Sequence, residues 1–338
     1  MTQASTPSTN PGSRRLIREM RPNERFGGAF SIGNAQMGMT RAGKPYLRCL
    51  LRDRTGEAPG RKWSITEEEF RALPTDGFVW AEGEIQPYQG ELQFIIQAIN
   101  PIEPTAEQLR DLLPTTLRDP SEMFAEVSAK LHSLQHPAMR ALADAYLGDE
   151  MLMEQFRQAP AAKSLHHAFL GGLLEHTLQL LSLAEAMLPL YPALSRDVVL
   201  MGLFLHDLGK TRELSWERGF GYTDRGELVG HVVEGAIMLH DKAQQVMRTA
   251  GIRFPRHAVT VLQHIIVSHH GLPEFGAAKV PATPEAVFVA LLDNLDAKTA
   301  MALATARPAT PRDFDLGGNF TEKHWGLDTR LFRPDPLG

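Results

Sequence analysis

The chain has 338 residues, of which 43% are hydrophobic and 22% charged, and its formal net charge is −5. This length suits two domains, and the composition is ordinary for a soluble globular protein. No apolar run is long enough to span a bilayer, which excludes a transmembrane protein. The single cysteine, Cys49, excludes an internal disulfide framework and a cysteine-rich zinc site.

The charge and the histidines are unevenly distributed. The stretch from Arg14 to Lys62 holds twelve Lys or Arg against four Asp or Glu, whereas all 13 histidines lie after residue 130. This separation predicts two modules with different roles. Residues 1–24 lack the basic-then-apolar order of a secretion signal, so we expect a flexible tail on a cytoplasmic protein without a membrane partner.

Residues 25–103 predict a five-stranded β-barrel of the OB type. Five short runs are rich in strand-forming residues: 28–33, 45–52, 60–64, 78–85 and 91–99. Turn-forming residues separate them at Arg41–Lys44, Asp53–Gly56 and Gln86–Gly90. A helical insert is expected at Thr66–Leu73, between the third and fourth strands. Five strands in about 80 residues with such an insert suit this small barrel.

The barrel carries a candidate surface for nucleic acid. The stretch Lys44–Glu57, followed by Arg61-Lys62-Trp63, resembles the second and third strands of OB-folds that hold a single strand with basic and aromatic side chains. The candidate binding residues are Lys44, Tyr46, Arg48, Arg52, Arg61 and Tyr88. The alternative is that this basic stretch is only a solvated face. Trp63 and Trp80 are expected in the barrel core.

From about Pro104 the apolar residues recur at helical spacing. Residues 104–160 predict a helical linker region with helices over Pro120–Leu131 and Pro137–Leu147. Pro160 then marks a break before an all-helical domain at 161–310, which a C-terminal extension at 311–338 follows. The predicted fold is therefore multidomain, with an N-terminal barrel and an all-α second domain.

The second domain places polar residues in apolar helices. We expect helices from about Ser164, over Asp197–Asp207, from Leu228 to about Met247, over Ala258–Ser268 and from Thr283 onward. Each carries a His or an Asp where a plain core would have Leu: His176, His206 with Asp207, His231, His269 with His270, and Asp293.

A single histidine on an apolar face is more often a hydrogen-bonded core residue than a ligand. Five consecutive helices of this kind are different, because each buried unpaired polar group costs several kcal/mol unless something satisfies it. Imidazole nitrogen and carboxylate oxygen are natural ligands of divalent metals. The series therefore predicts a mononuclear or dinuclear metal site.

These residues resemble the HD-domain phosphohydrolases, a superfamily named for the adjacent His-Asp pair. Within it, the chain is similar to the YhaM-type 3′→5′ exoribonucleases. The resemblance rests on six segments: 166–177, 206–210, 230–231, 269–276, 293–298 and 320–328. It implies an OB-fold ahead of an HD domain, dependence on Mn²⁺, and action on single-stranded RNA or DNA from the 3′ end.

The resemblance also implies roles for single residues. His176, His206, Asp207 and Asp293 would hold one ion, and His231, His269 and His270 a second, with Asp207 as the bridge. Fe²⁺, Mg²⁺ and Co²⁺ are alternatives to Mn²⁺. The implied catalytic residues are Asp207, Lys210 and His231, with Lys210 steadying a phosphate oxygen. The alternative for Lys210 is a plain surface lysine at a helix end.

Other residues near these motifs stay open. His166 and His167 could contact the ligands, contact the substrate or be structural, and Asp296 and Lys298 could be no more than solvated surface charges. The segment Gly271–Gly276 departs from the Gly-Tyr-Pro signature of cyclic-di-GMP phosphodiesterases, which disfavours a signalling role.

Two alternative functions remain beside the exoribonuclease. One is an HD phosphohydrolase of small or cyclic nucleotides, and the other is a catalytically inactive RNA-binding protein. The intact ligand series counts against the inactive protein. The aromatic segment 319–333 could support a homo-oligomer.

Overall fold

The structure is a computed structural model of the chain. It describes residues 16–40, 42–74, 77–88, 91–105, 111–163, 168–216, 220–307, 318–321 and 323–337. They form two compact units, the first ending at Pro114 and the second beginning at Thr115. Among the residues described, no helix is long and apolar enough to cross a membrane.

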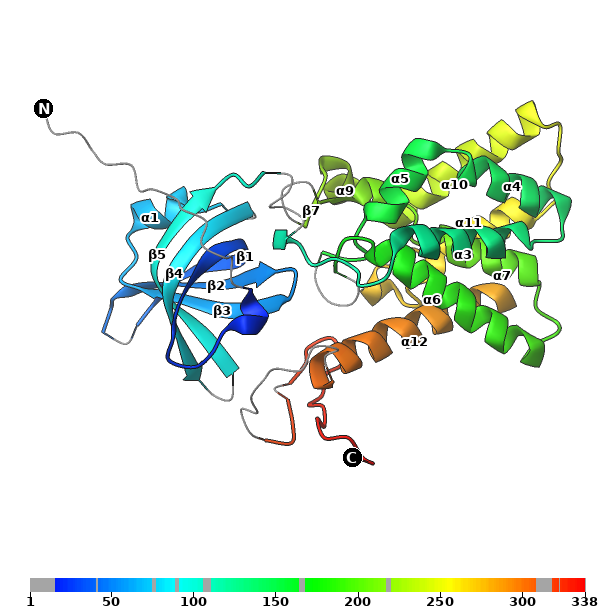
Figure 1. Cartoon of the computed structure of the whole chain (residues 1–338). Helices are drawn as coiled ribbons and strands as arrows, with labels where there is room; N and C mark the ends of the chain where they lie inside the picture. The colour runs from blue at the N-terminus through cyan, green and yellow to red at the C-terminus, as the bar shows by residue number, and fades with distance from the viewer. Residues whose placement is uncertain are drawn as a thin grey trace, which may run out of the picture. The chain divides into compact units, whose positions relative to one another are not determined.

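The first unit is a closed barrel of five strands (Figure 1). The strands are β1 (Arg25–Met39), β2 (Pro45–Asp53), β3 (Gly56–Trp63), β4 (Gly77–Tyr88) and β5 (Glu91–Ile102). Their order around the barrel is β1-β2-β3-β5-β4, and β4 pairs back to β1. All pairs are antiparallel except β3 with β5. This order and this single parallel pair are those of an OB-fold, so the predicted fold is confirmed.

The predicted insert between β3 and β4 is also confirmed, as α1 (Glu67–Ala72). The hydroxyl of Thr66 accepts from the backbone N–H of Glu69, and the Glu69 carboxylate accepts from the N–H of Thr66. This reciprocal capping satisfies two donors at the start of the helix and explains how so short a helix forms.

Alternation along the strands decides which side chains fill the barrel. On β2, Leu47, Cys49 and Leu51 are buried, while the residues between them point outward. The interior is completed by three phenylalanines in edge or tilted contact, Phe26, Phe30 and Phe94.

Trp63 and Trp80 were expected in this interior, and that prediction is wrong. Their exposed fractions are 46% and 40%. Trp80 lies between the buried Val79 and Ala81, so the alternation puts its ring outside.

The segment just before β1 belongs to the barrel core. It contains a short 3-10 helix, η1 (Ile17–Glu19), and Leu16, Ile17 and Met20 are buried. The backbone N–H of Ile17 donates to Asp53 at 2.6 Å, which fixes the segment to the end of β2. The flexible tail predicted for residues 1–24 therefore does not reach this far; residues 1–15 lie outside those described.

The second unit is helical. Its helices are α3 (Pro120–His132), α4 (Pro137–Leu147), α5 (Glu150–Gln158), α6 (Gly172–Met187), α7 (Arg196–Leu205), α8 (Lys210–Glu213), α9 (Asp224–Leu228), α10 (Gly230–Thr249), α11 (Ala258–Ser268) and α12 (Pro284–Ala306). Two short 3-10 helices, η2 (Leu188–Leu190) and η3 (Pro273–Phe275), and a two-stranded sheet, β6 (Leu214–Ser215) with β7 (Gly221–Tyr222), complete it.

Most helix boundaries agree with the sequence signals. The predicted helices at 137–147 and 258–268 have the observed bounds, and Thr283 caps α12 by accepting from the N–H of Ala286. The helix expected from Ser164 begins instead at Gly172. Gly171 precedes it at φ +80°, a left-handed conformation from which an α-helix does not extend backwards.

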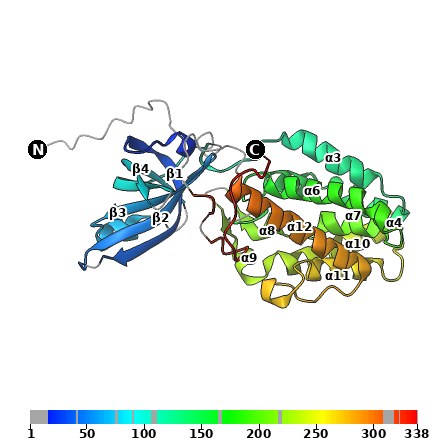
Figure 2. The same ribbon diagram turned by 90° about the horizontal axis from the view of Figure 1, so that it is seen from below.

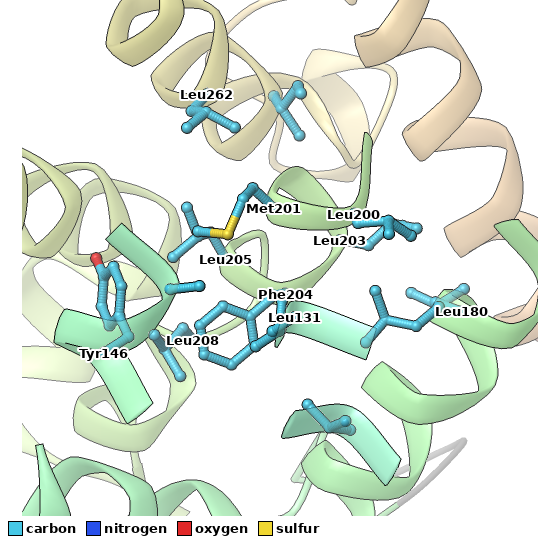
Figure 3. Packing of buried hydrophobic residues seen from close by; sticks show 14 of the residues in the cluster. Leu131, Tyr146, Leu180, Leu200, Met201, Leu203, Phe204, Leu205, Leu208 and Leu262 are labelled. Atoms are coloured by element: carbon cyan, nitrogen blue, oxygen red, sulfur yellow. The ribbon is translucent and has the colours of Figure 1, made fainter. Parts of the chain in front are cut away.

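One hydrophobic core joins these helices. Figure 2 shows α6, α7, α10, α11 and α12 side by side, and α3, α4 and α5 pack into the same core. Figure 3 shows the centre of this core, where Phe204 of α7 meets Tyr146 of α4 edge-on at a centroid distance of 5.8 Å. From α3 onward, the region predicted as a helical linker (104–160) is thus part of the helical unit.

Candidate metal centre

The seven predicted ligands converge from five helices. His176 lies in α6, His206 and Asp207 directly follow α7, and His231 lies in the first turn of α10. His269 and His270 directly follow α11, and Asp293 lies in α12. These seven residues are called the metal centre below. Five of them are buried, while His270 and Asp293 are half-buried.

The ligand atoms fall into two groups that share Asp207. One group contains His176, His206 and Asp207, and the other contains Asp207, His231, His269 and His270. Within each group one nitrogen or oxygen from every residue lies within 4.8 Å of the others. A shared carboxylate between two sets of imidazoles is an arrangement that can hold two ions.

Each oxygen of Asp207 faces one group. Its Oδ2 lies 3.8 Å from Nε2 of His176 and 3.5 Å from Nε2 of His206. Its Oδ1 lies 3.5 Å from Nε2 of His231 and 3.4 Å from Nε2 of His269. Asp293 belongs with the first group, because its Oδ1 lies 3.2 Å from Nε2 of His176.

Three histidines are oriented by backbone carbonyls. Nδ1 of His206 lies 2.7 Å from the carbonyl of Leu203, and Nδ1 of His269 lies 2.7 Å from that of Ile266. Both carbonyls belong to the last turn of a helix, where they lack an intrahelical partner. Nδ1 of His270 lies 2.7 Å from the carbonyl of Phe275. Because a carbonyl only accepts, Nδ1 carries the proton in each ring, and the Nε2 lone pair faces the centre.

The other two histidines that face the centre are oriented by carboxylates that the sequence reasoning missed. Nδ1 of His176 lies 2.8 Å from Oδ2 of Asp296, and Nδ1 of His231 lies 2.9 Å from Oε1 of Glu213. The same Glu213 oxygen accepts from the backbone N–H of His231 at 2.9 Å. The sequence left open whether Asp296 is only a surface charge, and its exposed fraction of 8% shows that it is buried. Its spacing of three from Asp293, on one helix face, was the available signal.

Several ionisable groups of the metal centre have shifted pKa values. Burial would lower the pKa of His176, but hydrogen bonds to Asp293 and Asp296 raise it to about 9. Burial would raise the pKa of Asp293, yet the hydrogen bond to His176 and the charge of the surrounding histidines hold it well below its usual value. For His206 burial dominates and lowers the pKa to about 4. Without a metal the carboxylates thus keep His176 protonated at neutral pH, and a bound cation would take the place of that proton, whereas His206 is already neutral.

Unsatisfied atoms show that the centre fits a divalent metal. Nε2 of His176 and of His206 lie 3.3 Å apart, as do those of His231 and His270. Among the described residues, Oδ1 of Asp207 and Nε2 of His269 are buried and have no hydrogen-bond partner. Leaving such atoms unpaired is costly, and a cation between them would satisfy them all. The donor set of imidazoles and carboxylates suits a divalent metal ion.

Lys210 is part of this site. Its Nζ donates to Oδ2 of Asp207 at 2.7 Å, and only 13% of the side chain is exposed. Burial would lower its pKa, but the neighbouring Asp207 raises it, so the ammonium stays charged. The alternative of a plain surface lysine is therefore wrong. Lys298 is exposed, and His166 and His167 lie outside the described residues.

The predicted nucleic-acid residues gather on the outside of the barrel. Tyr46, Arg48 and Arg52 point outward from β2, and Arg61 points outward from β3. Lys44 is exposed in the turn before β2. The guanidinium of Arg61 lies 5.3 Å from the ring centroid of Tyr88, which connects β4 to this surface. We call these side chains and Trp63 the basic outer face.

Two arginines oppose each other on this face. Arg48 and Arg61 are direct partners across β2 and β3, a placement that repels without a bound anion. Arg48 donates to Gln36 at 2.6 Å, and no carboxylate of a described residue pairs with either arginine. Next to them, the rings of Tyr46 and Trp63 lie 5.4 Å apart. Trp63, which the sequence reasoning assigned to the core, thus adds an aromatic surface to the basic one.

Comparison with known proteins gives a consistent picture. Residues 173–298 match the HD domain family. A protein named 3'-5' exoribonuclease YhaM from Shouchella clausii is 32% identical over 317 residues, which cover 94% of this chain and 95% of that protein. Its namesake from a Geobacillus species is 33% identical over 89% of each chain. That from Bacillus licheniformis is 32% identical over 89% of this chain and 92% of its own length.

Proposed function

The chain belongs to the family of 3′–5′ exoribonuclease YhaM, and we propose that it shortens single-stranded RNA from the 3′ end at the metal centre of its helical unit. It is a metal-dependent enzyme with a nucleic acid substrate. The observation that carries the proposal is the pair of histidine groups that share Asp207, one through each carboxylate oxygen.

The seven residues of the metal centre would hold two ions. His176, His206, Asp207 and Asp293 would hold one ion, and the second would lie between Asp207 and three further imidazoles: His231, His269 and His270. When bound, divalent ions act as Lewis acids that polarise the scissile phosphate. We propose Mn²⁺ as the ion, with Fe²⁺, Mg²⁺ and Co²⁺ as the alternatives to test.

The protein's own groups position the reaction. Lys210 pairs with Oδ2 of Asp207 and would add a positive charge beside a phosphate bound at the metal centre. Asp296 and Glu213 fix the rings of His176 and His231 through their Nδ1 atoms. In the proposed reaction, water attacks the terminal phosphorus, the bond to the preceding 3′ oxygen breaks, and that oxygen takes a proton. The products are a nucleoside monophosphate and an RNA shorter by one residue.

The barrel, residues 25–103, would bind the strand through its basic outer face. The opposed Arg48 and Arg61 favour phosphate between them, and the Tyr46 and Trp63 rings offer a surface on which bases stack. This mode of binding reads the backbone and the base faces rather than a sequence. DNA would therefore bind as well, and the selectivity for RNA is left to the helical domain, 161–310.

Two further predictions remain proposals. A homo-oligomer could form through the extension at 311–338, where Phe320, Trp325 and Phe332 have exposed fractions of 50%, 73% and 46%. A cytoplasmic location stays a prediction from the sequence.

The test is a 5′-labelled single-stranded RNA incubated with the purified protein and Mn²⁺. We expect a ladder of products shortened from the 3′ end. The double variant His206→Ala/Asp207→Ala should give none, while His240→Ala, an exposed histidine on α10, should give the wild-type ladder. Repeating the assay after chelation with each candidate ion, and with DNA of the same sequence, identifies the metal and the substrate.

Two results would contradict the proposal. Release of phosphate from free nucleotides without any ladder would indicate a small-nucleotide phosphohydrolase. RNA binding without turnover under any of the four ions would indicate an inactive binding protein.

A further inference from the structure

A polar cavity lies in the helical unit, apart from the metal centre. It has a volume of about 290 Å³, near the lower end for small-molecule sites. None of the seven metal-centre residues lines it. Its lining comes from α4, the start of α5, α8 and α10, and its ionisable side chains are Tyr146, Asp149, Arg212, Asp241, Lys242 and Arg248.

The hydroxyl of Tyr146 is the unexplained group in this cavity. Tyr146 is fully buried, and its hydroxyl has no hydrogen-bond partner among the described residues. In Figure 3 its oxygen points away from Phe204 and Leu208 of the apolar core. Burial raises the pKa of Tyr146, while Arg212 lowers it and Asp241 and Asp149 raise it. Tyr146 lines the same cavity as Asp149, Arg212 and Asp241, so a molecule bound there could complete the hydrogen bond of the phenol.

Hydrogen-bond donors dominate the rest of the lining. The side chain of Lys242 is 13% exposed, and its ammonium lies 5.5 Å from the ring centroid of Tyr146. The same ammonium forms an ion pair with Asp149 at 2.8 Å. Arg212 binds Glu234 through one nitrogen, at 2.6 Å. Arg248 is exposed, and none of the described carboxylates pairs with it. The lining thus combines three cations and a phenol with two carboxylates, Asp241 and the Asp149 that is paired with Lys242.

We propose that this cavity binds a small molecule carrying a phosphate monoester. Phosphate oxygens only accept, and they match the ammonium, the two guanidinium groups and the phenol. Asp241, an acceptor on the exposed side, would repel a second phosphate but accept hydrogen bonds from sugar hydroxyls. A nucleoside monophosphate therefore fits better than inorganic phosphate.

The cavity is connected to the metal centre through two adjacent residues. Arg212 lines the cavity, and the next residue, Glu213, orients His231. Glu234, one turn after His231 on α10, is buried and accepts from Arg212 and from Arg225 at 2.6 Å each. A ligand that draws on Arg212 would therefore alter the support of His231. This effect on turnover rests on the proposed function, whereas the binding site itself does not.

The test measures binding and turnover separately. Calorimetric titrations of the full chain with AMP, inorganic phosphate and adenosine are made in the presence of a chelator, so that no metal-bound site contributes. We expect AMP to bind more tightly than phosphate, and adenosine to bind weakest. Tyr146→Phe and Arg248→Ala should each weaken AMP binding about tenfold, while Arg256→Ala, an exposed arginine outside the lining, should not.

Tyr146→Phe also separates a ligand site from a structural role. Because no residue that the structure describes bonds to the hydroxyl, its removal should leave the melting temperature of the ligand-free protein unchanged or higher. The proposal is overturned if AMP and phosphate fail to bind at millimolar concentration, or if both variants bind as wild type does. A change of RNA turnover with AMP in the wild type, lost in Arg248→Ala, would test the connection to His231.

Discussion

The metal centre and the basic outer face both gather charge, but they arrange it in opposite ways. In the metal centre, Asp207 is 3% exposed, and each surrounding imidazole is held by a second protein group. On the barrel, Arg48 and Arg61 lie on the outer side of two strands with solvent beside them. The difference suits the roles proposed for the two regions, because bond cleavage needs ligands fixed to fractions of an ångström, whereas binding of a moving strand needs only tolerant contacts.

Burial also sets how strongly each region responds to change. A charge without its partner inside the protein costs several kcal/mol, while an exposed ion pair contributes about 1 kcal/mol or less. Substitutions in the metal centre should therefore act nearly all-or-none. Those on the barrel should act in small steps.

The largest effect is expected for Asp207→Asn. Asparagine keeps the shape but offers one neutral oxygen, where Asp207 faces both histidine groups with charged oxygens. We expect the single-turnover rate on RNA to fall by about 10³-fold or more. RNA affinity, measured by fluorescence anisotropy, should stay within about twofold of the wild type, since the barrel is unchanged. Asp224→Asn serves as the control, and a rate within tenfold of the wild type for Asp207→Asn would contradict the role proposed for Asp207.

Asp296→Asn and Glu213→Gln should have the next largest effect. Each removes the charge that orients one metal-centre histidine while keeping an acceptor atom in place. We expect each to weaken Mn²⁺ binding by about 10- to 100-fold, as titration followed by electron paramagnetic resonance would measure. Asp296 should affect the ion beside His176, and Glu213 the ion beside His231. If the metal affinity is unchanged and only the melting temperature falls, both residues have a structural role and do not support metal binding.

A smaller, salt-dependent effect is expected for Arg48→Ala with Arg61→Ala. Each arginine that contacts a phosphate of a single strand contributes about 0.7 to the slope of log affinity against log salt. We therefore expect the slope to fall by about 1.4, and cleavage of a dinucleotide to be unchanged. The free energy of unfolding should not fall, because a like-charge pair is removed. Arg71→Ala, an exposed arginine of α1, is the matched control.

The smallest effect is expected for Trp63→Leu. Stacking of a base on an aromatic ring contributes about 1–3 kcal/mol, and we expect the lower end because Tyr46 already covers part of the Trp63 ring. RNA affinity should then fall about fivefold at constant salt slope. The control is Trp80→Leu, which changes an exposed tryptophan of a different strand, β4, and should leave the RNA affinity unaltered. Equal losses in the two variants would mean that the basic outer face is not the binding surface.

Much of the fold could be predicted because its signals are local. Alternation along β2 and helical spacing in α11 depend only on neighbouring residues, and Thr66 and Thr283 cap their helices through residues three positions away. Trp63 and Trp80 were wrongly predicted to be buried because that prediction rested on their hydrophobic character and not on their position in the strand. The three phenylalanines contribute to filling the interior, and the alternation left both indoles outside.

The metal centre, too, could be predicted from the sequence only in part. The sequence predicts which helices carry a His or an Asp toward the core, since a polar residue stands out against an apolar helix face. Two features follow only from the packed structure: Asp296 supports His176, which lies 120 residues away, and Asp207 turns one oxygen toward each histidine group. The physical reason is that burial of apolar surface drives the helices together but does not specify how they are oriented. Their final packing therefore sets the distances on which coordination depends.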